Sequence, residues 1–152
     1  MTLRIITIGK KHESWVTEGI SRYQKRLKQA FITEWVLLPH SSREGHVART
    51  EESQRILHKL DPRDYVILLD ETGKNIDSLT LSQLLKSQID TSRPIVIIIG
   101  GAYGVDQTIH QRADFVWSLS LLVFPHQLVR LILAEQIYRA QEIASGNPYH
   151  HE

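Results

Sequence analysis

The chain has 152 residues, of which 41% are hydrophobic, and this suits one compact domain over residues 1–152 with an ordinary apolar core. It has no cysteine, which excludes disulfides, a thiolate nucleophile and cysteine-ligated zinc. Its longest apolar stretches, Tyr65–Leu69 and Ile95–Ile99, are far shorter than the roughly 20 residues that cross a bilayer, so we expect no membrane span. The 18 basic and 17 acidic residues give a net charge of only +1.

The N-terminal half predicts strands and helices in alternation. Leu3–Ile8 is predicted to be the first strand. This apolar stretch is too short for a secretory signal peptide, contains Arg4 and lacks a small-residue cleavage site, so we interpret it as a strand of a cytoplasmic protein. Apolar residues at helical spacing predict a helix over Glu13–Gln29. The next predicted elements are a strand, a polar loop and a helix, over Phe31–Leu38, His40–Gly45 and Val47–Leu60.

The C-terminal half continues the alternation. Tyr65–Leu69 is apolar at every position, as is typical of a strand covered by helices on both sides, and a turn over Asp70–Lys74 should follow it. The remaining predicted elements are a helix, two strands and a long helix, over Ser78–Ile89, Ile95–Ile99, Phe115–Ser118 and Gln127–Ala144. This order predicts an α/β fold with a mainly parallel sheet and helices on both faces.

Three segments that follow predicted strands are expected at one edge of this sheet: Leu69–Asp70, Gly100–Gly101 and Leu119–Phe124. In open parallel sheets, ligands bind outside the carboxyl ends of the strands. The Gly100–Gly104 loop allows backbone to approach a ligand closely, although a plain strand-to-helix turn would also explain it. A dinucleotide fingerprint and a P-loop are both absent from the chain.

The Leu119–Phe124 segment is unusual because five of its six residues are apolar and it runs directly into Pro125, which cannot donate to a sheet. Its backbone amides and carbonyls need partners. An adenine ring could supply both a donor and an acceptor while packing between apolar side chains. An ordinary core loop is the alternative interpretation.

Charge is distributed unevenly along the chain. Residues 1–30 carry seven basic and two acidic side chains, a net +5, which leaves −4 over the remainder. A basic face attracts a polyanion over a Debye length of about 8 Å at physiological salt, so this third of the chain is a candidate RNA-contacting surface. A solvated helix face is the alternative.

Three stretches in this order resemble the SPOUT-class RNA methyltransferases, and within them the ribosomal RNA large subunit methyltransferase H family: the Gly100–Gly104 loop, the run Ser118–Gln127 and the ending Asn147-Pro148-Tyr149-His150-His151-Glu152. The resemblance spans essentially the whole chain. It implies a trefoil-knot fold, a homodimer, and methylation of N3 of a pseudouridine in large-subunit (23S) ribosomal RNA within assembled ribosomes. It also implies that S-adenosylmethionine is held by a defined set of residues: Leu69, Gly100, Leu119, Ser120, Leu121, Leu122, Val123 and Phe124.

Methyl transfer to an imide nitrogen requires loss of its proton, so a general base or hydrogen-bonding group is useful. The candidate catalytic residues are His126, which we expect to organise the pocket, and Tyr149 or His150, which we expect to touch the target nucleotide. The candidate RNA-binding residues are Lys10, Lys11, Arg22, Lys25, Arg26 and His151, the last standing where the family has Arg or Lys. We expect no metal, because the vicinal His150 and His151 cannot readily aim at one ion and no H-E-x-x-H motif is present.

The long helix Gln127–Ala144 is apolar around much of its girth, which predicts burial on a second side, for example in a homodimer. In such a dimer, the tail of one copy could reach the pocket of the other. Two other function classes stay open on the residues alone. They are a non-catalytic RNA- or ribosome-binding module, and a small α/β enzyme acting on a metabolite. For a methyltransferase, another RNA is an alternative substrate.

Overall fold

The computed structural model describes residues 2–151; Met1 and Glu152, the last residue of the tail motif, lie outside the described residues. Its centre is a five-stranded sheet in the order β2-β1-β4-β3-β5, in which every pair of neighbouring strands is parallel. The strands are β1 (Leu3–Ile8), β2 (Thr33–Leu38), β3 (Tyr65–Lys74), β4 (Ile95–Ile99) and β5 (Phe115–Trp117). The predicted α/β class is therefore confirmed.

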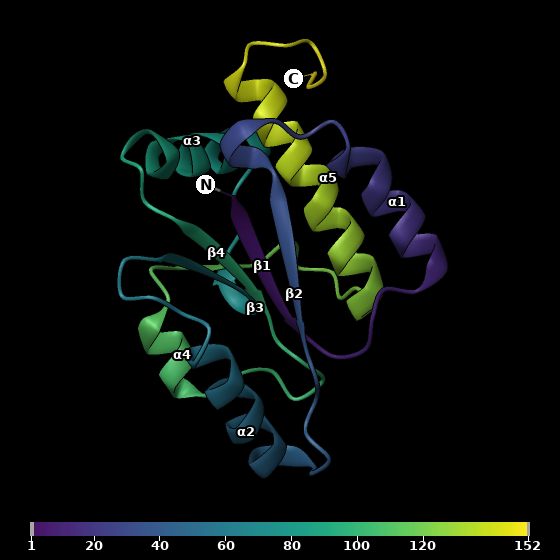
Figure 1. Cartoon of the computed structure of the whole chain (residues 1–152), viewed down its shortest axis with the longest axis vertical. Helices are drawn as coiled ribbons and strands as arrows, with labels where there is room; N and C mark the ends of the chain where they lie inside the picture. Colours follow the sequence, from purple (N-terminus) through teal and green to yellow (C-terminus); the bar gives the residue numbers. More distant parts are fainter. Residues whose placement is uncertain (1, 152) are drawn as a thin grey trace.

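Helices cover both faces of the sheet (Figure 1). The α-helices are α1 (Ser14–Gln24), α2 (Gly45–Leu57), α3 (Ser78–Asp90), α4 (Gln107–Arg112) and α5 (His126–Ala144), and a short 3₁₀ helix, η1, spans Gln29–Phe31. On one face α5 packs between α1 and α3, whereas α2 and α4 lie on the other. Gly19 allows the close approach of α1 to α5, because a Cβ there would lie 2.6 Å from Leu131 Cδ1.

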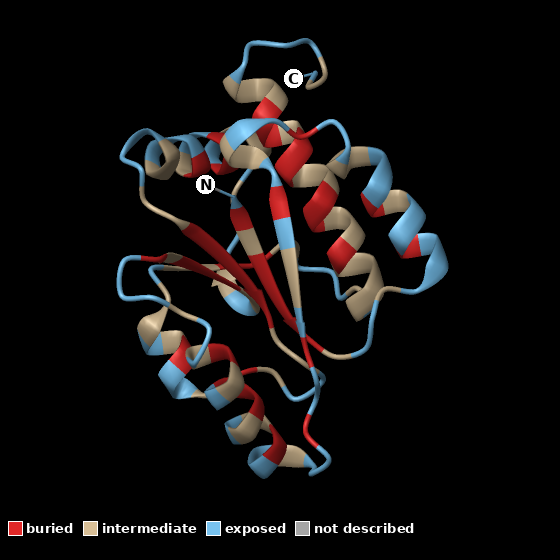
Figure 2. Cartoon of the chain, viewed as in Figure 1, coloured by how far each residue is buried: buried red, intermediate tan, exposed pale blue. Residues whose placement is uncertain are grey.

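The core lies on both sides of the sheet, and its most buried strands are β1, β4 and the first half of β3 (Figure 2). Alternate side chains of one strand enter different layers: Ile97 packs under α3 and α5, while Ile98 packs under α2 and α4. All five residues of β4 are at most 4% exposed. Each fully buried isoleucine contributes roughly 1.5–3 kcal/mol to the stability of the fold. Burial on both faces therefore holds the strands, and with them the loops that follow their carboxyl ends, in place.

Several predicted boundaries were wrong. Asp70–Lys74 is not a turn but the end of β3, which resumes pairing with β5 at Lys74 after an irregularity that begins at Leu69. The first helix ends at Gln24 instead of Gln29. The amides of Arg26 and Leu27 bond only three residues back, to the carbonyls of Tyr23 and Gln24, and Gln29, with φ +52°, lies outside the helical region. The helix α4 was not predicted at all, since its six residues are too few for a clear apolar period.

Two structural facts bear on the expectations from sequence. Among residues 2–151, no helix combines the length and the apolar character that a membrane span requires. The apolar sides of α5, for which we expected cover from a second copy of the chain, are partly covered by α1 and α3 of the same chain. The knot and the homodimer stay predictions.

Candidate functional site

The three segments singled out from the sequence lie together at the carboxyl edge of the sheet. Leu69 near the end of the regular part of β3, Gly100 after β4 and the Leu119–Phe124 segment after β5 all line one cleft of about 740 Å³. Parallel pairing brings these ends together: Leu69 is opposite Ile99 on β4, and β5 pairs with the other side of β3. We call this cavity the donor cleft.

The glycine loop forms one wall of the donor cleft. A Cβ on Gly100 would lie 3.0 Å from Val105 Cγ1 and 3.3 Å from the carbonyl carbon of Gly104, so only a glycine fits without displacement. Gly104 has φ +72° and donates its amide hydrogen to the Gly101 carbonyl over 3.0 Å. The loop is therefore a tight, closed turn that presents backbone to the cleft.

The opposite wall is apolar and open. Leu121, Leu122 and Val123 are 90%, 72% and 87% exposed, values that are unusual for three consecutive apolar side chains. The loop is shaped from within, because Ser118 Oγ donates to the Ser120 carbonyl and Ser120 Oγ accepts the Leu122 amide hydrogen, both over 3.0 Å. Such a wall can exchange water for an apolar ligand surface.

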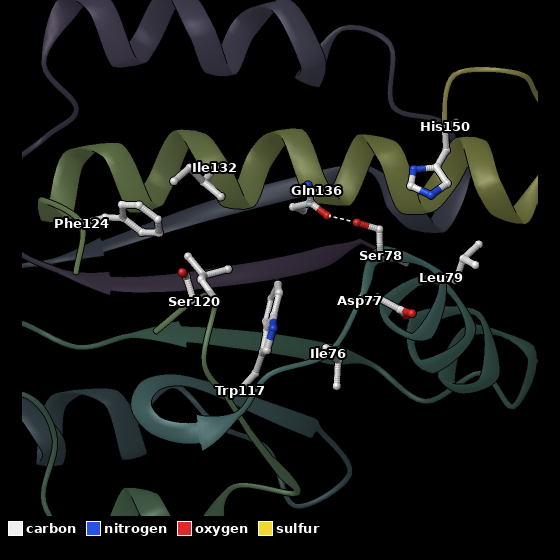
Figure 3. Close-up of a pocket in the computed structure, with 11 residues that line it drawn as sticks. Ile76, Asp77, Ser78, Leu79, Trp117, Ser120, Phe124, Ile132, Gln136 and His150 are labelled. Atoms are coloured by element: carbon white, nitrogen blue, oxygen red, sulfur yellow. Dashed lines mark hydrogen bonds between the residues drawn. The ribbon is translucent and has the colours of Figure 1, made fainter. Parts of the chain in front are cut away.

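A second cleft of about 590 Å³ shares Leu119, Ser120 and Phe124 with the donor cleft (Figure 3). One side is α5, with Phe124 and Ile132 at one end and His150 at the other, and Ser78 Oγ donates to Gln136 Oε1 across the groove over 2.7 Å. The Nε1 atom of Trp117, which also lines this cleft, is buried and has no hydrogen-bond partner among residues 2–151. The groove thus joins the donor cleft to the tail.

His126 belongs to a buried polar cluster at the start of α5. Its Nε2 atom lies 3.0 Å from Arg130 Nη2 and 3.1 Å from Thr7 Oγ1. Arg130 is fully buried and donates also to the Lys10 carbonyl and to His12 Nδ1, over 2.9 and 3.1 Å. Because a guanidinium can only donate, both imidazoles must accept from it, so each is in its neutral form.

Electrostatics agree with this assignment. Burial, followed by the positive charge of Arg130, lowers the pKa of His126 from 6.5 to about 4. The same two causes lower the pKa of His12, and burial lowers the pKa of Arg130. His126 is therefore a fixed acceptor that links β1 to α5, and its Nε2 lone pair is already used.

The tail folds back onto the C-terminal half of α5. The Tyr149 hydroxyl donates to Glu135 Oε2 over 2.9 Å, and the Tyr149 ring lies against Tyr138 and 4.8 Å from the Arg139 guanidinium. Burial and the hydrogen bond to Glu135 raise the pKa of Tyr149 to about 12. Arg139 Nη1 lies 3.1 Å from His150 Nδ1. The tail is thus held by one cluster of side chains from a single helix.

The three candidate catalytic residues are not brought together within one chain. His126 opens α5, whereas Tyr149 and His150 contact Arg139, thirteen residues further along the same helix. At 1.5 Å per residue, Arg139 lies about 20 Å from His126 along the helix axis, and Glu135, which Tyr149 also contacts, lies about 13 Å from it.

The candidate RNA-binding residues are all exposed but form two groups instead of one patch. Lys10 and Lys11 precede α1 at the carboxyl edge of the sheet, and Arg22, Lys25 and Arg26 lie at the other end of α1. The Arg26 carbonyl accepts from Gln141 on α5 over 3.1 Å, which places the second group beside the tail end of α5. His151 is exposed in that tail.

The donor cleft is also lined by two carboxylates, Asp70 and Glu71, and by Arg49 and His110. The Nε atom of Arg49 is buried and unpartnered among residues 2–151. Among residues 2–151, no group of three or more histidine, aspartate or glutamate side chains is placed to hold a metal ion.

Comparison with known proteins identifies the family. A family model described as a predicted SPOUT methyltransferase matches residues 1–150. The chain belongs to the SPOUT methyltransferase family. Proteins named ribosomal RNA large subunit methyltransferase H are similar over their whole length. Those from Leuconostoc citreum, Hydrogenovibrio crunogenus and Streptococcus agalactiae are 41%, 38% and 40% identical, over 99%, 100% and 99% of both chains.

Sequence reasoning missed the polar residues that organise this SPOUT chain. Arg130 is fully buried, and Glu135 and Arg139 hold the tail. The sequence interpretation gave none of the three a role, because it treated this helix as apolar. One signal was present: an arginine set between Leu128, Val129, Leu131 and Ile132 interrupts an otherwise apolar run. Such a residue has to find acceptors when the helix is buried.

Proposed function

We propose that the protein is an S-adenosylmethionine-dependent methyltransferase that acts on N3 of a pseudouridine in large-subunit (23S) ribosomal RNA, within assembled ribosomes and hence in the cytoplasm. The observation that carries this proposal is the donor cleft, where Leu69, Gly100 and Leu119–Phe124 meet. Full-length similarity to proteins named for this substrate class supports the choice of RNA.

The residues present suit the methyl donor. The exposed side chains of Leu121, Leu122 and Val123 can cover an adenine ring, and the tight backbone at Gly100 admits a ribose or adenine edge without a side chain in the way. Asp70 and Glu71 suit the positive charges of the donor, and Arg49 suits its carboxylate. When bound, the donor supplies a methyl group on sulfonium, which needs no metal activation. The protein therefore has mainly to position two reactants.

Within the proposed mechanism, His150 is the best-placed of the three catalytic candidates to meet the target base. Since Arg139 donates to its Nδ1 atom, the neutral ring carries its proton on Nε2, and His150 lines the second cleft. We assign Nε2–H as a donor to a carbonyl oxygen of the target base, where negative charge develops as N3 gives its proton to solvent water before it attacks the methyl group. His150 then stabilises the imide anion instead of accepting its proton.

The other two candidates take supporting roles. Tyr149, with its pKa near 12, stays protonated at neutral pH and donates to Glu135, which anchors the tail beside His150. His126 links Thr7 and Arg130 and so fixes the start of α5, which directly follows the apolar wall of the donor cleft. Neither is free to act as a general base in this arrangement.

RNA contact is assigned to the two basic groups flanking α1, with the tail adding His151. Such a small protein has little surface for reading RNA sequence, so recognition of ribosome shape is the expected mode. We also propose a homodimer, because it lets the tail of one copy serve the donor cleft of the other.

Two measurements on the wild-type chain test the function. Calorimetric titration with S-adenosylmethionine should give saturable one-site binding, which a non-catalytic binding module has no reason to show. Transfer of a labelled methyl group should then be seen with ribosomes that lack the modification, and not with extract metabolites. Binding without transfer to any RNA would remove the proposed substrate, and absence of donor binding would remove the enzymatic proposal altogether.

A further inference from the structure

A buried carboxylate stands directly behind the glycine loop and has no part in the chemistry described so far. Glu52, on α2, is only 3% exposed. Its Oε2 atom accepts the amide hydrogen of Ser41 over 2.9 Å. Its Oε1 atom is buried and has no hydrogen-bond partner among residues 2–151. An unpartnered carboxylate oxygen in the interior is costly, so its position needs a physical reason.

The free oxygen faces the wall of the donor cleft. A Cβ built on Gly101 would lie 2.9 Å from Glu52 Oε1 and 2.9 Å from Ile8 Cγ2, so the loop backbone is pressed between the carboxylate and the end of β1. The next residue of α2 holds the chain just after this loop, because Ser53 Oγ accepts the Asp106 amide hydrogen over 2.9 Å. Two consecutive residues of α2 thus lie against the loop and the start of α4.

Glu52 also ties this loop to a second one. Ser41, in the connection between β2 and α2, is buried and bonded through its amide to Glu52 and through its hydroxyl to Glu51. The Glu52 carboxylate therefore lies between two loops, with one oxygen used and one oxygen free. The free one is the one aimed at the glycine loop.

We propose that Glu52 is a positioning residue for the methyl donor, resting on the function proposed above: its Oε1 atom accepts a backbone amide hydrogen of the Gly100–Gly104 loop when the donor is bound. A rotation of the peptide at Gly101 can turn an amide hydrogen toward Oε1, and glycine has the freedom to make it. Donor binding and this shift of the loop are then coupled, since the bond that satisfies Oε1 forms only in the donor-bound state. Glu52 itself does not touch the donor.

The test is Glu52→Gln, with Glu51→Gln as the matched control. Glutamine keeps the size of the side chain and can still accept from Ser41, but it then turns an NH₂ group toward Gly101. Glu51 is bonded to Ser41 as well and does not face the loop. We expect Glu52→Gln to weaken binding of S-adenosylmethionine about tenfold or more in calorimetric titration, while Glu51→Gln stays within about twofold of wild type.

Two further readouts separate positioning from a merely structural role. In Glu52→Gln the KM for the donor should rise while kcat at saturating donor stays near wild type. The donor-induced protection of amides 100–104 against hydrogen exchange should also be lost. If Glu52→Gln does not fold, Glu52→Asp, which retracts the carboxylate by one methylene, should weaken donor binding in the same way.

Two results overturn the inference: donor affinity and amide protection equal to wild type in the Glu52 variant, or equal losses in the Glu51 and Glu52 variants. Both require that the wild-type chain binds the donor. Failure of the wild type to bind would instead count against the proposed function.

Discussion

Arg130 is a fully buried guanidinium that forms no ion pair with a carboxylate among residues 2–151, so its charge has to be satisfied by neutral acceptors. Its hydrogen bonds go to a carbonyl and to the ring nitrogens of His12 and His126. Both rings can accept only while neutral, and protonation of either would place two cations side by side. The stability of the fold is thereby tied to pH.

We predict that the protein loses stability between pH 7 and pH 5. The pKa of His126 is about 4 in the folded state against 6.5 in the unfolded chain, so the unfolded state binds more protons in this window and gains from acidification. The stabilisation is complete above pH 6.5 and is lost as pH falls toward 4. The loss at pH 5 should be about 1–2 kcal/mol, a drop of several degrees in Tm by calorimetry.

The control for this prediction is His126→Gln, whose amide oxygen can still accept from Arg130 and does not titrate. The slope of Tm against pH should become shallower but not vanish, because the lowered pKa of His12 acts in the same direction. An unchanged slope in the variant would show that His126 is not the group responsible.

At the scale of elements, the loops of the donor cleft are supported unequally. The chain that follows the glycine loop is held by α2, whereas the Leu119–Phe124 segment has three largely exposed side chains in its middle, Leu121, Leu122 and Val123. An exposed apolar side chain contributes little to folding but gains when a ligand buries it. The second loop should therefore matter for binding and not for stability.

We predict that Leu122→Ala weakens donor binding about tenfold and leaves Tm within about one degree of wild type, because the side chain is 72% exposed before binding. Titration calorimetry and a thermal scan check the two parts. Leu37→Ala is the control, since Leu37 is another exposed leucine and lies on β2 outside the cleft. An equal loss of affinity in both variants would contradict the assignment of this loop to the donor.

The elements that could be predicted from sequence are those with a strong local pattern. The strand Ile95–Ile99 was predicted with both ends correct, because five consecutive β-branched residues between Pro94 and Gly100 indicate a short buried strand. The extension of β3 through Gly73 was missed, since a glycine flanked by polar residues indicates a turn. Here Gly73 instead allows close contact, with a Cβ only 2.6 Å from the Trp117 backbone.

Site residues divide in the same way. Residues at strand ends could be gathered at one edge from topology alone, and Leu69, Gly100 and Leu119–Phe124 do line one cleft. Glu52 and Arg130 could not be found, because their roles depend on contacts with residues 49 and 120 positions away in the chain. Long-range polar contacts leave no periodic signal in a sequence.

At the scale of the whole molecule, the two basic groups at the ends of α1 lie apart, one beside the donor edge and one beside the tail. We predict that the double variant Lys25→Gln, Arg26→Gln weakens ribosome binding and lowers the slope of log affinity against log salt by about 1.5–2, as expected for two lost phosphate contacts. Filter binding at several salt concentrations measures the slope. The matched control, Lys59→Gln with Lys74→Gln, removes two exposed lysines elsewhere and should leave the slope unchanged.

The distance between the tail and the start of α5 is compatible with two arrangements of tail and donor cleft. His150 contacts Arg139, about 20 Å along α5 from His126, while a groove lined by Gln136 and Ile132 leads from His150 to the donor cleft. Either the tail moves along this groove to the donor cleft of its own chain, or the tail of a second copy reaches that cleft. Only the second arrangement makes the dimer necessary for catalysis.

Mixing two inactive variants decides between these arrangements. Gly100→Val should abolish donor binding, because the added side chain collides with Val105 and Gly104, and His150→Ala should abolish methyl transfer while donor binding is kept. If tails act across the dimer, subunit exchange creates heterodimers with one intact site, built from the donor cleft of one variant and the tail of the other. Random pairing makes about half of the dimers mixed, so about one quarter of wild-type activity should return. If each tail serves its own cleft, both sites of every heterodimer are defective, and the mixture stays as inactive as its components.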